Sequence, residues 1–332
     1  MVIVAVHVFA VSEENYKVCV ERGIVAIPEA KEGPRHDNII DGLLSRLCGI
    51  KEDDFVLMYV TKSKSLRGVW QVEGRPFYDE TQVWQDRLYP FRCRIRWSKY
   101  NFQNPLKLDD INDLRNTGKI WTWALERSTG SNAMFSISNG EFLTILTEFL
   151  KINPFSSQKG RILQPYPYRE FNLYEHLHFQ SELPKYEFTV MALLNAEFAK
   201  RSYKDIFGNY SDCLCYVPTN LGKEMDFLLM YDNPILENQV VSYDIIEVKR
   251  DVFDEDALCQ LISYESWFLQ KKVSGDSNMV RTTAIAKTYA EEVIQYVAQR
   301  TRIENKPIKL LEYCYNNGTL KLSDITKKEI DT

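Results

Sequence analysis

Residues 243–268 read YDIIEVKRDVFDEDALCQLISYESWF, and this stretch decides how the C-terminal half is interpreted. Its mostly apolar start, residues 243–246, leads to Glu247 and Lys249 with one residue between them. Side chains two apart on a β-strand share a face, so a carboxylate and an ammonium group are expected side by side on a buried element. Burying charge is costly unless the charge is paired or needed. The stretch therefore predicts a chemical site.

Two further motifs surround this strand. Asp226 opens another apolar run, residues 227–231, and lies 21 residues before Glu247. Beyond the strand, Gln260 and Tyr264 are four residues apart and share one face of the helix predicted at 257–269. An aspartate followed by Glu-x-Lys on the next strand resembles the catalytic core of the PD-(D/E)XK nuclease superfamily. Gln-x-x-x-Tyr resembles the accessory motif of its RecB-like branch.

The resemblance implies phosphodiester hydrolysis with Mg²⁺ (or Mn²⁺) as cofactor. Asp226, Glu247 and the backbone carbonyl of Val248 would hold the metal, since Mg²⁺ prefers a few oxygen ligands and retains several waters. A bound divalent ion makes water nucleophilic and accepts the charge that develops on phosphorus. Lys249 would orient the attacking water or stabilise that charge. With Gln260 and Tyr264, these residues form the predicted catalytic set.

The superfamily also carries an acidic residue on the helix that precedes the sheet, and two glutamates qualify here. On a helical wheel Glu187 lies near the centre of the apolar stripe, and Glu197 lies about 80° to its side. Both stay open as members of the site. The competing interpretation makes Glu247 and Lys249 a solvent-facing pair on an amphipathic strand. The combination with Asp226 and the following helix favours the nuclease.

The N-terminal half reads mainly as short strands, including residues 2–11, 55–60 and 69–72. Residues 23–149 contain Gly68-Val69-Trp70, then Tyr78, Trp84 and Tyr89-Pro90-Phe91-Arg92. This pattern resembles the EVE domain, a PUA-like barrel related to YTH readers of modified bases. Asn15-Tyr16 occupies the position of the family's early Asn-Trp pair. The resemblance implies a nucleic-acid reader.

The segment FRCRIRW (91–97) places Arg92, Arg94 and Arg96 in alternation with apolar residues. A strand would present three guanidinium groups on one face, and without acidic partners these predict phosphate contacts. An ordinary solvated strand face is the alternative. Several aromatic residues are candidates for stacking on a base, although each alone is more often a core residue: Trp70, Trp84, Tyr59 and Tyr78. A polar loop containing Ser131 and Asn132 is a candidate for contacts with a base edge.

The composition is that of a globular protein of 332 residues with a net charge of −5 and seven cysteines that form no CxxC pair. It indicates a reducing, cytoplasmic setting, and no apolar run approaches the roughly 18 residues of a membrane span. We predict an α+β fold with two domains: a PUA-like barrel with flanking helices at 1–152, a linker at 153–170, and an α/β mixed sheet of the restriction-endonuclease type at 171–332. The linker contains three prolines and shows no apolar period.

The leading functional hypothesis is a modification-dependent DNA endonuclease, in which the N-terminal domain reads a modified base and the C-terminal domain cuts. The alternatives are a structure-specific nuclease, resembling archaeal NucS-like enzymes that act on branched or single-stranded DNA, and a non-cleaving reader. DNA is the expected partner and RNA the less favoured one, with no membrane contact. Cutting both strands often requires two active sites, so a homodimer is the expected assembly.

Overall fold

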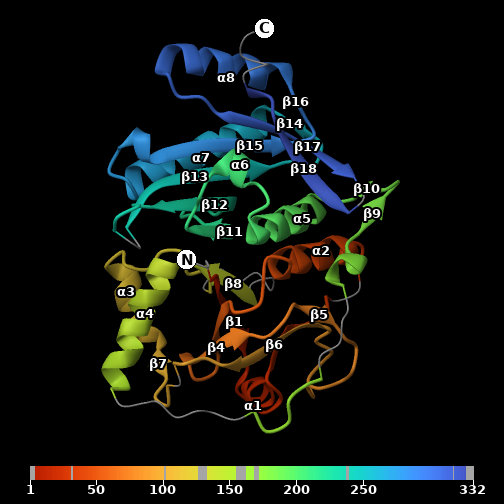
Figure 1. Cartoon of the computed structure of the whole chain (residues 1–332), viewed down its shortest axis with the longest axis vertical. Helices are drawn as coiled ribbons and strands as arrows, with labels where there is room; N and C mark the ends of the chain where they lie inside the picture. The colour runs from red at the N-terminus through yellow and green to blue at the C-terminus, as the bar shows by residue number, and fades with distance from the viewer. Residues whose placement is uncertain are drawn as a thin grey trace. The chain divides into compact units, whose positions relative to one another are not determined.

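The computed structural model describes residues 4–30, 33–100, 102–125, 133–154, 162–167, 172–236, 239–316 and 318–326. Clustering of contacts divides the chain into two compact units, Met1–Leu177 and His178–Thr332 (Figure 1). Both units combine helices with a mixed sheet, as the predicted α+β class requires. In the described part of the chain, no helix is long and apolar enough to cross a membrane.

The N-terminal unit is built on a curled sheet of eight strands. Its strands are β1 (Val6–Val11), β2 (Ile24–Ile27), β3 (Phe55–Val60), β4 (Ser65–Val72), β5 (Phe77–Tyr78), β6 (Phe91–Trp97), β7 (Leu106–Lys107) and β8 (Met134–Ile137). They lie in the order β2-β6-β4-β3-β1-β8, with β5 paired to β6 and β7 paired to β4. Strands β1 and β3 run parallel, whereas the other neighbours run antiparallel.

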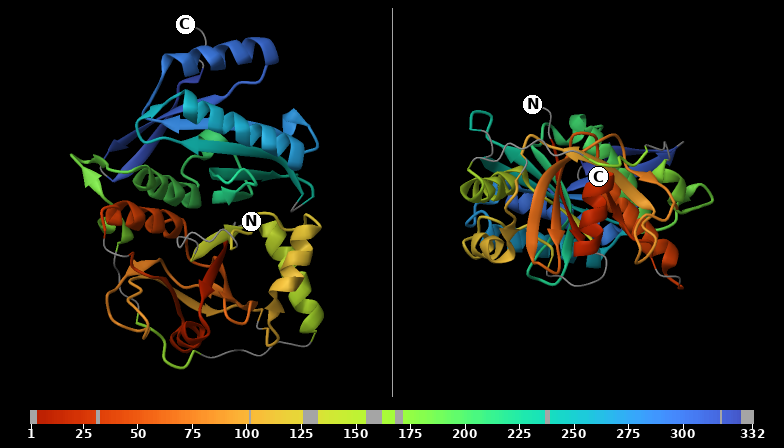
Figure 2. Two further views of the ribbon diagram at one scale, coloured as in Figure 1. Left: turned by 180° about the vertical axis from the view of Figure 1, so that it is seen from behind. Right: turned by 90° about the horizontal axis from the view of Figure 1, so that it is seen from below.

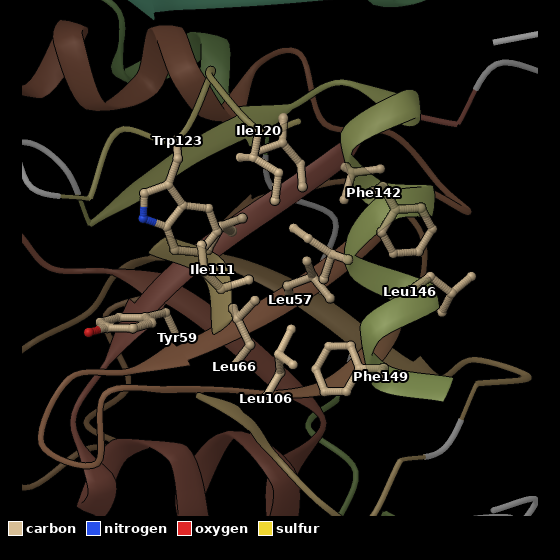
Figure 3. Close-up of a cluster of buried hydrophobic side chains, with 14 of the residues drawn as sticks. Leu57, Tyr59, Leu66, Leu106, Ile111, Ile120, Trp123, Phe142, Leu146 and Phe149 are labelled. Carbon is tan, nitrogen blue, oxygen red and sulfur yellow. The ribbon is translucent and has the colours of Figure 1, made fainter. Parts of the chain in front are cut away.

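Four helices flank this sheet: α1 (Glu13–Arg22), α2 (His36–Leu47), α3 (Leu108–Asn116) and α4 (Asn139–Ile152). Apolar periodicity in the sequence at 38–47, 106–114 and 141–150 predicts the last three. The first was missed, although Ser12 caps its N-terminus and two glutamates follow, as helix starts favour. Figure 3 shows Phe142, Leu146 and Phe149 of α4 packed towards the strands, where they form a core with Leu57 and Leu66.

Part of the predicted linker belongs to the N-terminal unit. Tyr166 is buried, and its hydroxyl donates to Asp79 and accepts from Arg92. The backbone N–H groups of Gln164 and Tyr166 donate to carbonyl groups of Glu21 and Arg22 at the end of α1. Residues 162–167 therefore lie along α1, even though no apolar period predicts this packing.

The C-terminal unit is built on a six-stranded mixed sheet. Its elements are β9 (Phe179–Gln180), β10 (Leu183–Pro184), α5 (Glu187–Lys200), α6 (Lys204–Phe207), β11 (Asp212–Pro218), β12 (Glu224–Asp232), β13 (Val240–Val248), β14 (Val252–Phe253), α7 (Glu255–Lys271), β15 (Val280–Ala286), β16 (Thr288–Tyr289), α8 (Glu291–Glu304), β17 (Lys309–Asn316) and β18 (Thr319–Asp324). The sheet order is β11-β12-β13-β15-β17-β18. Its central pairs β13-β15 and β15-β17 are parallel, and its outer pairs are antiparallel.

Helices α5 and α7 pack on opposite faces of this sheet, as the two views in Figures 1 and 2 show. Phe198 of α5 contacts Phe227 of β12, whereas Phe268 of α7 contacts Tyr243 of β13. An apolar stripe in the sequence predicts a single helix across 186–206. The structure ends α5 earlier, at Arg201, whose backbone has a φ of 61°. The end of β13 therefore lies between α5, on one face of the sheet, and α7, on the other.

Candidate active site

Asp226 and Glu247 lie opposite each other on neighbouring antiparallel strands. Phe227 of β12 pairs with Ile246 of β13, so the next position along the ladder brings Asp226 beside Glu247 on the face that α7 covers. The backbone N–H of Val248 donates to Asp226 Oδ2 at 2.8 Å. This bond fixes the aspartate over the end of β13.

Lys249, at the first position beyond β13, pairs with the carboxylates of Glu247 and Glu187. Its Nζ lies 2.7 Å from Glu247 Oε1 and 3.7 Å from Glu187 Oε2. Its backbone N–H donates to the carbonyl of Ile285 on the parallel strand β15. The sequence prediction that Glu247 and Lys249 project together therefore agrees with the geometry, and the pair is not a solvent-facing one because the Glu247 side chain is fully buried.

The two candidate helix glutamates are resolved by position. Glu187 is the first residue of α5 and reaches Lys249, whereas Glu197 binds Lys200 at 2.7 Å further along the helix. Ten residues of α-helix separate them by about 15 Å. Glu187 therefore belongs to the cluster, and Glu197 does not.

The cluster of Glu187, Asp226, Glu247 and Lys249 is crowded with negative charge. Burial, followed by the neighbouring Glu247, raises the pKa of Asp226 well above its usual range. Burial raises the pKa of Glu247 to about 7 against the lowering effect of Lys249, and it also raises the pKa of Glu187. Burial alone would lower the pKa of Lys249, but Glu247 and Asp226 outweigh it and raise that pKa. Lys223 also lowers the pKa of Glu247 and Arg250 lowers that of Glu187, yet burial outweighs these cations at both carboxyl groups.

Gln260 and Tyr264 meet as predicted and face the start of β12. Gln260 Nε2 donates to the Tyr264 hydroxyl at 2.9 Å, and that hydroxyl donates to the carbonyl of Glu224 at 2.7 Å. Lys223 Nζ, in turn, lies 3.4 Å from Gln260 Oε1. The Tyr264 ring is fully buried, so the motif ties α7 to the strand that carries Asp226. This arrangement identifies Tyr264 as a positioning residue.

One buried atom tests whether the cluster suits a divalent cation. Glu247 Oε2 is buried and has no hydrogen-bond partner in the described part of the chain, although buried carboxylate oxygens normally have one. The described residues of the whole chain include no group of three or more His, Cys, Asp or Glu side chains that could hold a metal ion. Asp226 and Glu247 thus fit an ion that takes one or two carboxylates and keeps its waters, as Mg²⁺ does.

The three arginines of β6 are paired, so the premise for predicting phosphate contacts is wrong. Arg92 is fully buried and donates to the carbonyl of Tyr89 at 2.7 Å, to the carbonyl of Thr81 and to the Tyr166 hydroxyl. Arg94 binds Glu73 at 2.6 Å, and Arg96 binds Asp53. The three arginines do alternate along β6, but their acidic partners come from loops that are distant in the sequence.

The predicted base-stacking residues lie in different places. Trp70 is buried and stacks on Trp97 with ring centroids 3.8 Å apart, and Tyr59 packs edge-on against Trp123 in the core. Tyr78 stacks on His176 and donates to Glu80. These three are therefore structural. Ser131 and Asn132 lie outside the described residues.

Trp84 is also buried, with Arg92 over its ring, but it lines a small pocket of about 240 Å³ in the N-terminal unit. The Tyr89 hydroxyl accepts from Asn15 Nδ2 at 2.8 Å and donates to Asp86 at 2.7 Å on the pocket wall. Arg87 lies over the Tyr89 ring, with 57% of its side chain exposed. Sequence reasoning missed Asn15, Asp86, Arg87 and Tyr89 as a group, because α1 and the loop after Trp84 meet only in the fold.

No protein-family model matches the chain, and no curated protein matches it. Several solved structures are similar to part of it, and three of them are as follows. Protein Atu2648 from Agrobacterium tumefaciens has 14% identity and a TM-score of 0.28, over 47% of this chain and 98% of that one. Human THYN1 in complex with 5-methylcytosine-containing DNA has 9% identity and a TM-score of 0.30, over 44% and 97%. The YTH domain of Zygosaccharomyces rouxii MRB1 in complex with N6-methyladenosine RNA has 15% identity and a TM-score of 0.30, over 44% and 84%. Values this low assign no activity to this chain.

Proposed function

We propose that the C-terminal unit is a metal-dependent nuclease that hydrolyses phosphodiester bonds in DNA. The observation that carries the proposal is the convergence of Asp226, Glu247 and Lys249 where β12 begins and β13 ends, with a buried Glu247 oxygen that has no hydrogen-bond partner among the described residues. A purely structural ion pair gives no reason for a second buried carboxylate beside Glu247. A cation site gives that reason directly.

Each residue has a role in this proposal. Asp226 and Glu247 would hold Mg²⁺ or Mn²⁺, with the Val248 carbonyl as a further ligand on the same strand end. The ion supplies an activated water and neutralises charge on the phosphate. Lys249 holds its ammonium against Glu247 and is placed to orient a water or to stabilise the developing negative charge. Glu187 faces Lys249 from the far side and limits its motion.

The test compares purified full-length variants in Mg²⁺ and in EDTA on single-stranded, duplex and flap DNA. Asp226→Asn and Glu247→Gln should abolish cleavage, and Lys249→Ala should severely reduce it. Asp244→Asn is the matched control, because Asp244 is a buried acid on the same strand with its own partner, Thr283. Cleavage by Glu247→Gln at the wild-type rate would contradict the assignment of this active site.

A second function, recognition of a base by the N-terminal unit, is supported by the pocket that Trp84, Tyr89 and Asn15 line. An aromatic wall and several polar groups are what a pocket for an extruded base needs. Together with the sequence resemblance to the EVE domain, this supports a modification-dependent enzyme. The alternatives are a structure-specific nuclease and a non-cleaving reader.

Titration of paired oligonucleotides that differ only in one base modification tests the reader. A methyl group that fills apolar pocket volume contributes on the order of 0.8 kcal/mol, which predicts a several-fold gain in affinity. Equal affinities across a panel of modified DNA and RNA would exclude the modification-dependent enzyme in favour of the structure-specific nuclease. Binding of modified DNA without cleavage in Mg²⁺ would leave the non-cleaving reader.

A further inference from the structure

A groove of about 560 Å³ lies between α7 and the turn that joins β11 to β12. The helix contributes residues three or four positions apart, which share one face. The groove is lined from α7 by Gln260, Ser263, Trp267, Gln270 and Lys271, and from the turn by Asn220, Leu221 and Lys223. Its size falls within the range of ligand-binding clefts, about 300–1,000 Å³.

The groove is continuous with the candidate active site. Gln260 and Tyr264 belong to both, and Lys223 of the turn lies 3.4 Å from Gln260. The turn leads directly into β12, and Asp226 lies three residues after Lys223. Three residues of strand span about 10 Å, so a polymer whose backbone occupies the active site would reach this groove within one or two nucleotides.

The lining has the chemistry of a nucleic-acid surface. The ring of Trp267 is half-buried in the wall, where Phe268 contacts it edge-on and Lys272 lies 5.6 Å from its centroid. Lys223 and Lys271 supply positive charge, and the described residues that line the groove include no carboxylate. Leu221, with 49% of its surface exposed, adds an apolar contact at the turn. An aromatic ring flanked by lysines and amides suits a base followed by phosphates.

We propose that this groove binds an unpaired stretch of the nucleic-acid strand that enters the active site, with one base stacked on Trp267 and phosphates beside Lys223 and Lys271. The proposal rests on the nuclease function and names its substrate class. A base within a duplex already stacks on both neighbours, so only an unpaired base offers a free face to the tryptophan. The groove therefore favours single strands or flaps over continuous duplex.

Strand binding in EDTA, measured by fluorescence anisotropy with the full-length protein, tests this proposal without cleavage. The probe is a fluorescein-labelled single-stranded 12-mer, compared with its duplex. Trp267→Ala should weaken single-strand binding about tenfold, within a five- to hundred-fold range, and Trp267→Phe should restore most of it. Lys271→Gln should reduce the salt slope by about 0.7. Tyr296→Ala and Lys321→Gln are matched controls, because both residues are exposed and lie outside the groove.

The outcomes separate the groove from the nuclease. Unchanged single-strand binding by folded Trp267→Ala overturns the groove, as does an equal loss of duplex affinity. If circular dichroism shows that Trp267→Ala does not fold, the test of the groove uses Trp267→Phe and Lys271→Gln. An unchanged salt slope for Lys271→Gln overturns the phosphate contact. If the wild-type protein binds single strands through Trp267 but does not cleave DNA in Mg²⁺, the groove proposal stands and the nuclease proposal is overturned.

Discussion

The hydroxyl of Tyr264 donates to the backbone carbonyl of Glu224, two residues before Asp226. A buried tyrosine on α7 therefore sets the position of the strand that brings one acidic residue to the other. In the proposed metal site, this contact would support the ligand Asp226 from outside the coordination shell, and the loss of such support typically lowers metal affinity about 10- to 100-fold.

Tyr264→Phe should raise the Mg²⁺ concentration for half-maximal cleavage about tenfold. The phenyl ring keeps the packing but leaves the Glu224 carbonyl and the Gln260 amide without their shared partner. Tyr203→Phe is the matched control, because the Tyr203 hydroxyl also donates to a buried carbonyl, that of Leu320, outside the site. Both variants should lose stability, and a Mg²⁺ shift that is equal in the two would contradict a positioning role.

Glu247→Gln should stabilise the metal-free protein at pH 8. The pKa of Glu247 rises from its ordinary 4.5 to about 7 on folding, so the folded state prefers the neutral form. Ionisation therefore costs stability as pH rises from about 4.5 through about 7, and below that window the cost is absent. In EDTA the melting temperature of the wild type should fall across this window more steeply than that of the variant.

Added Mg²⁺ should reverse this order at pH 8 by stabilising the wild type alone. Thermal melts with and without the ion provide the measurement, and Asp244→Asn again serves as the control. A Glu247→Gln variant that is less stable than the wild type in EDTA at pH 8 would show that Lys249 fully compensates the buried carboxylate.

Arg92→Ala should destabilise the protein by about 3–5 kcal/mol, because it leaves Asp79 as a buried charge without its guanidinium partner. Arg96→Ala should cost under about 1 kcal/mol, since both members of its pair are substantially exposed. Urea unfolding of the two variants measures the difference. A similar small loss for both would mean that Arg92 is not the buried anchor described above.

Arg87→Ala should weaken nucleic-acid binding through the N-terminal unit and lower its salt slope by about 0.9 on duplex DNA. Arg87 lines the Trp84 pocket and pairs with Asp86 at 3.8 Å, but more than half of its side chain is exposed, whereas Arg75 is exposed outside that pocket and serves as the control. The slope is measured in EDTA with a modified duplex. Equal slopes for the two variants would place the phosphate contacts elsewhere.

Most of the candidate site was predictable because its members obey short-range rules. Glu247 and Lys249 share a strand face, Gln260 and Tyr264 share a helix face, and Asp226 opens an apolar run that becomes the neighbouring strand. The choice of Glu187 over Glu197 needed the fold, because only three-dimensional placement shows which end of α5 meets β13.

The acidic partners of Arg92, Arg94 and Arg96 could not be predicted, for a physical reason. Alternation reveals which residues share a face, but it does not reveal what lies opposite. Asp53, Glu73 and Asp79 come from segments 13 to 43 residues away, and no local pattern specifies such pairings. The same reasoning applies to Trp70 and Trp97, whose stacking depends on the register between β4 and β6.

Helix α1 connects two features that would otherwise be independent. Ser12, Asn15 and Cys19 on its first turns border the Trp84 pocket, and Glu21 and Arg22 at its other end hold residues 164 and 166 of the segment that leads to the C-terminal unit. A ten-residue helix is a stiff rod on this scale. A ligand that tilts α1 from the pocket end would therefore also displace residues 164 and 166, which the other end of the helix holds by backbone hydrogen bonds.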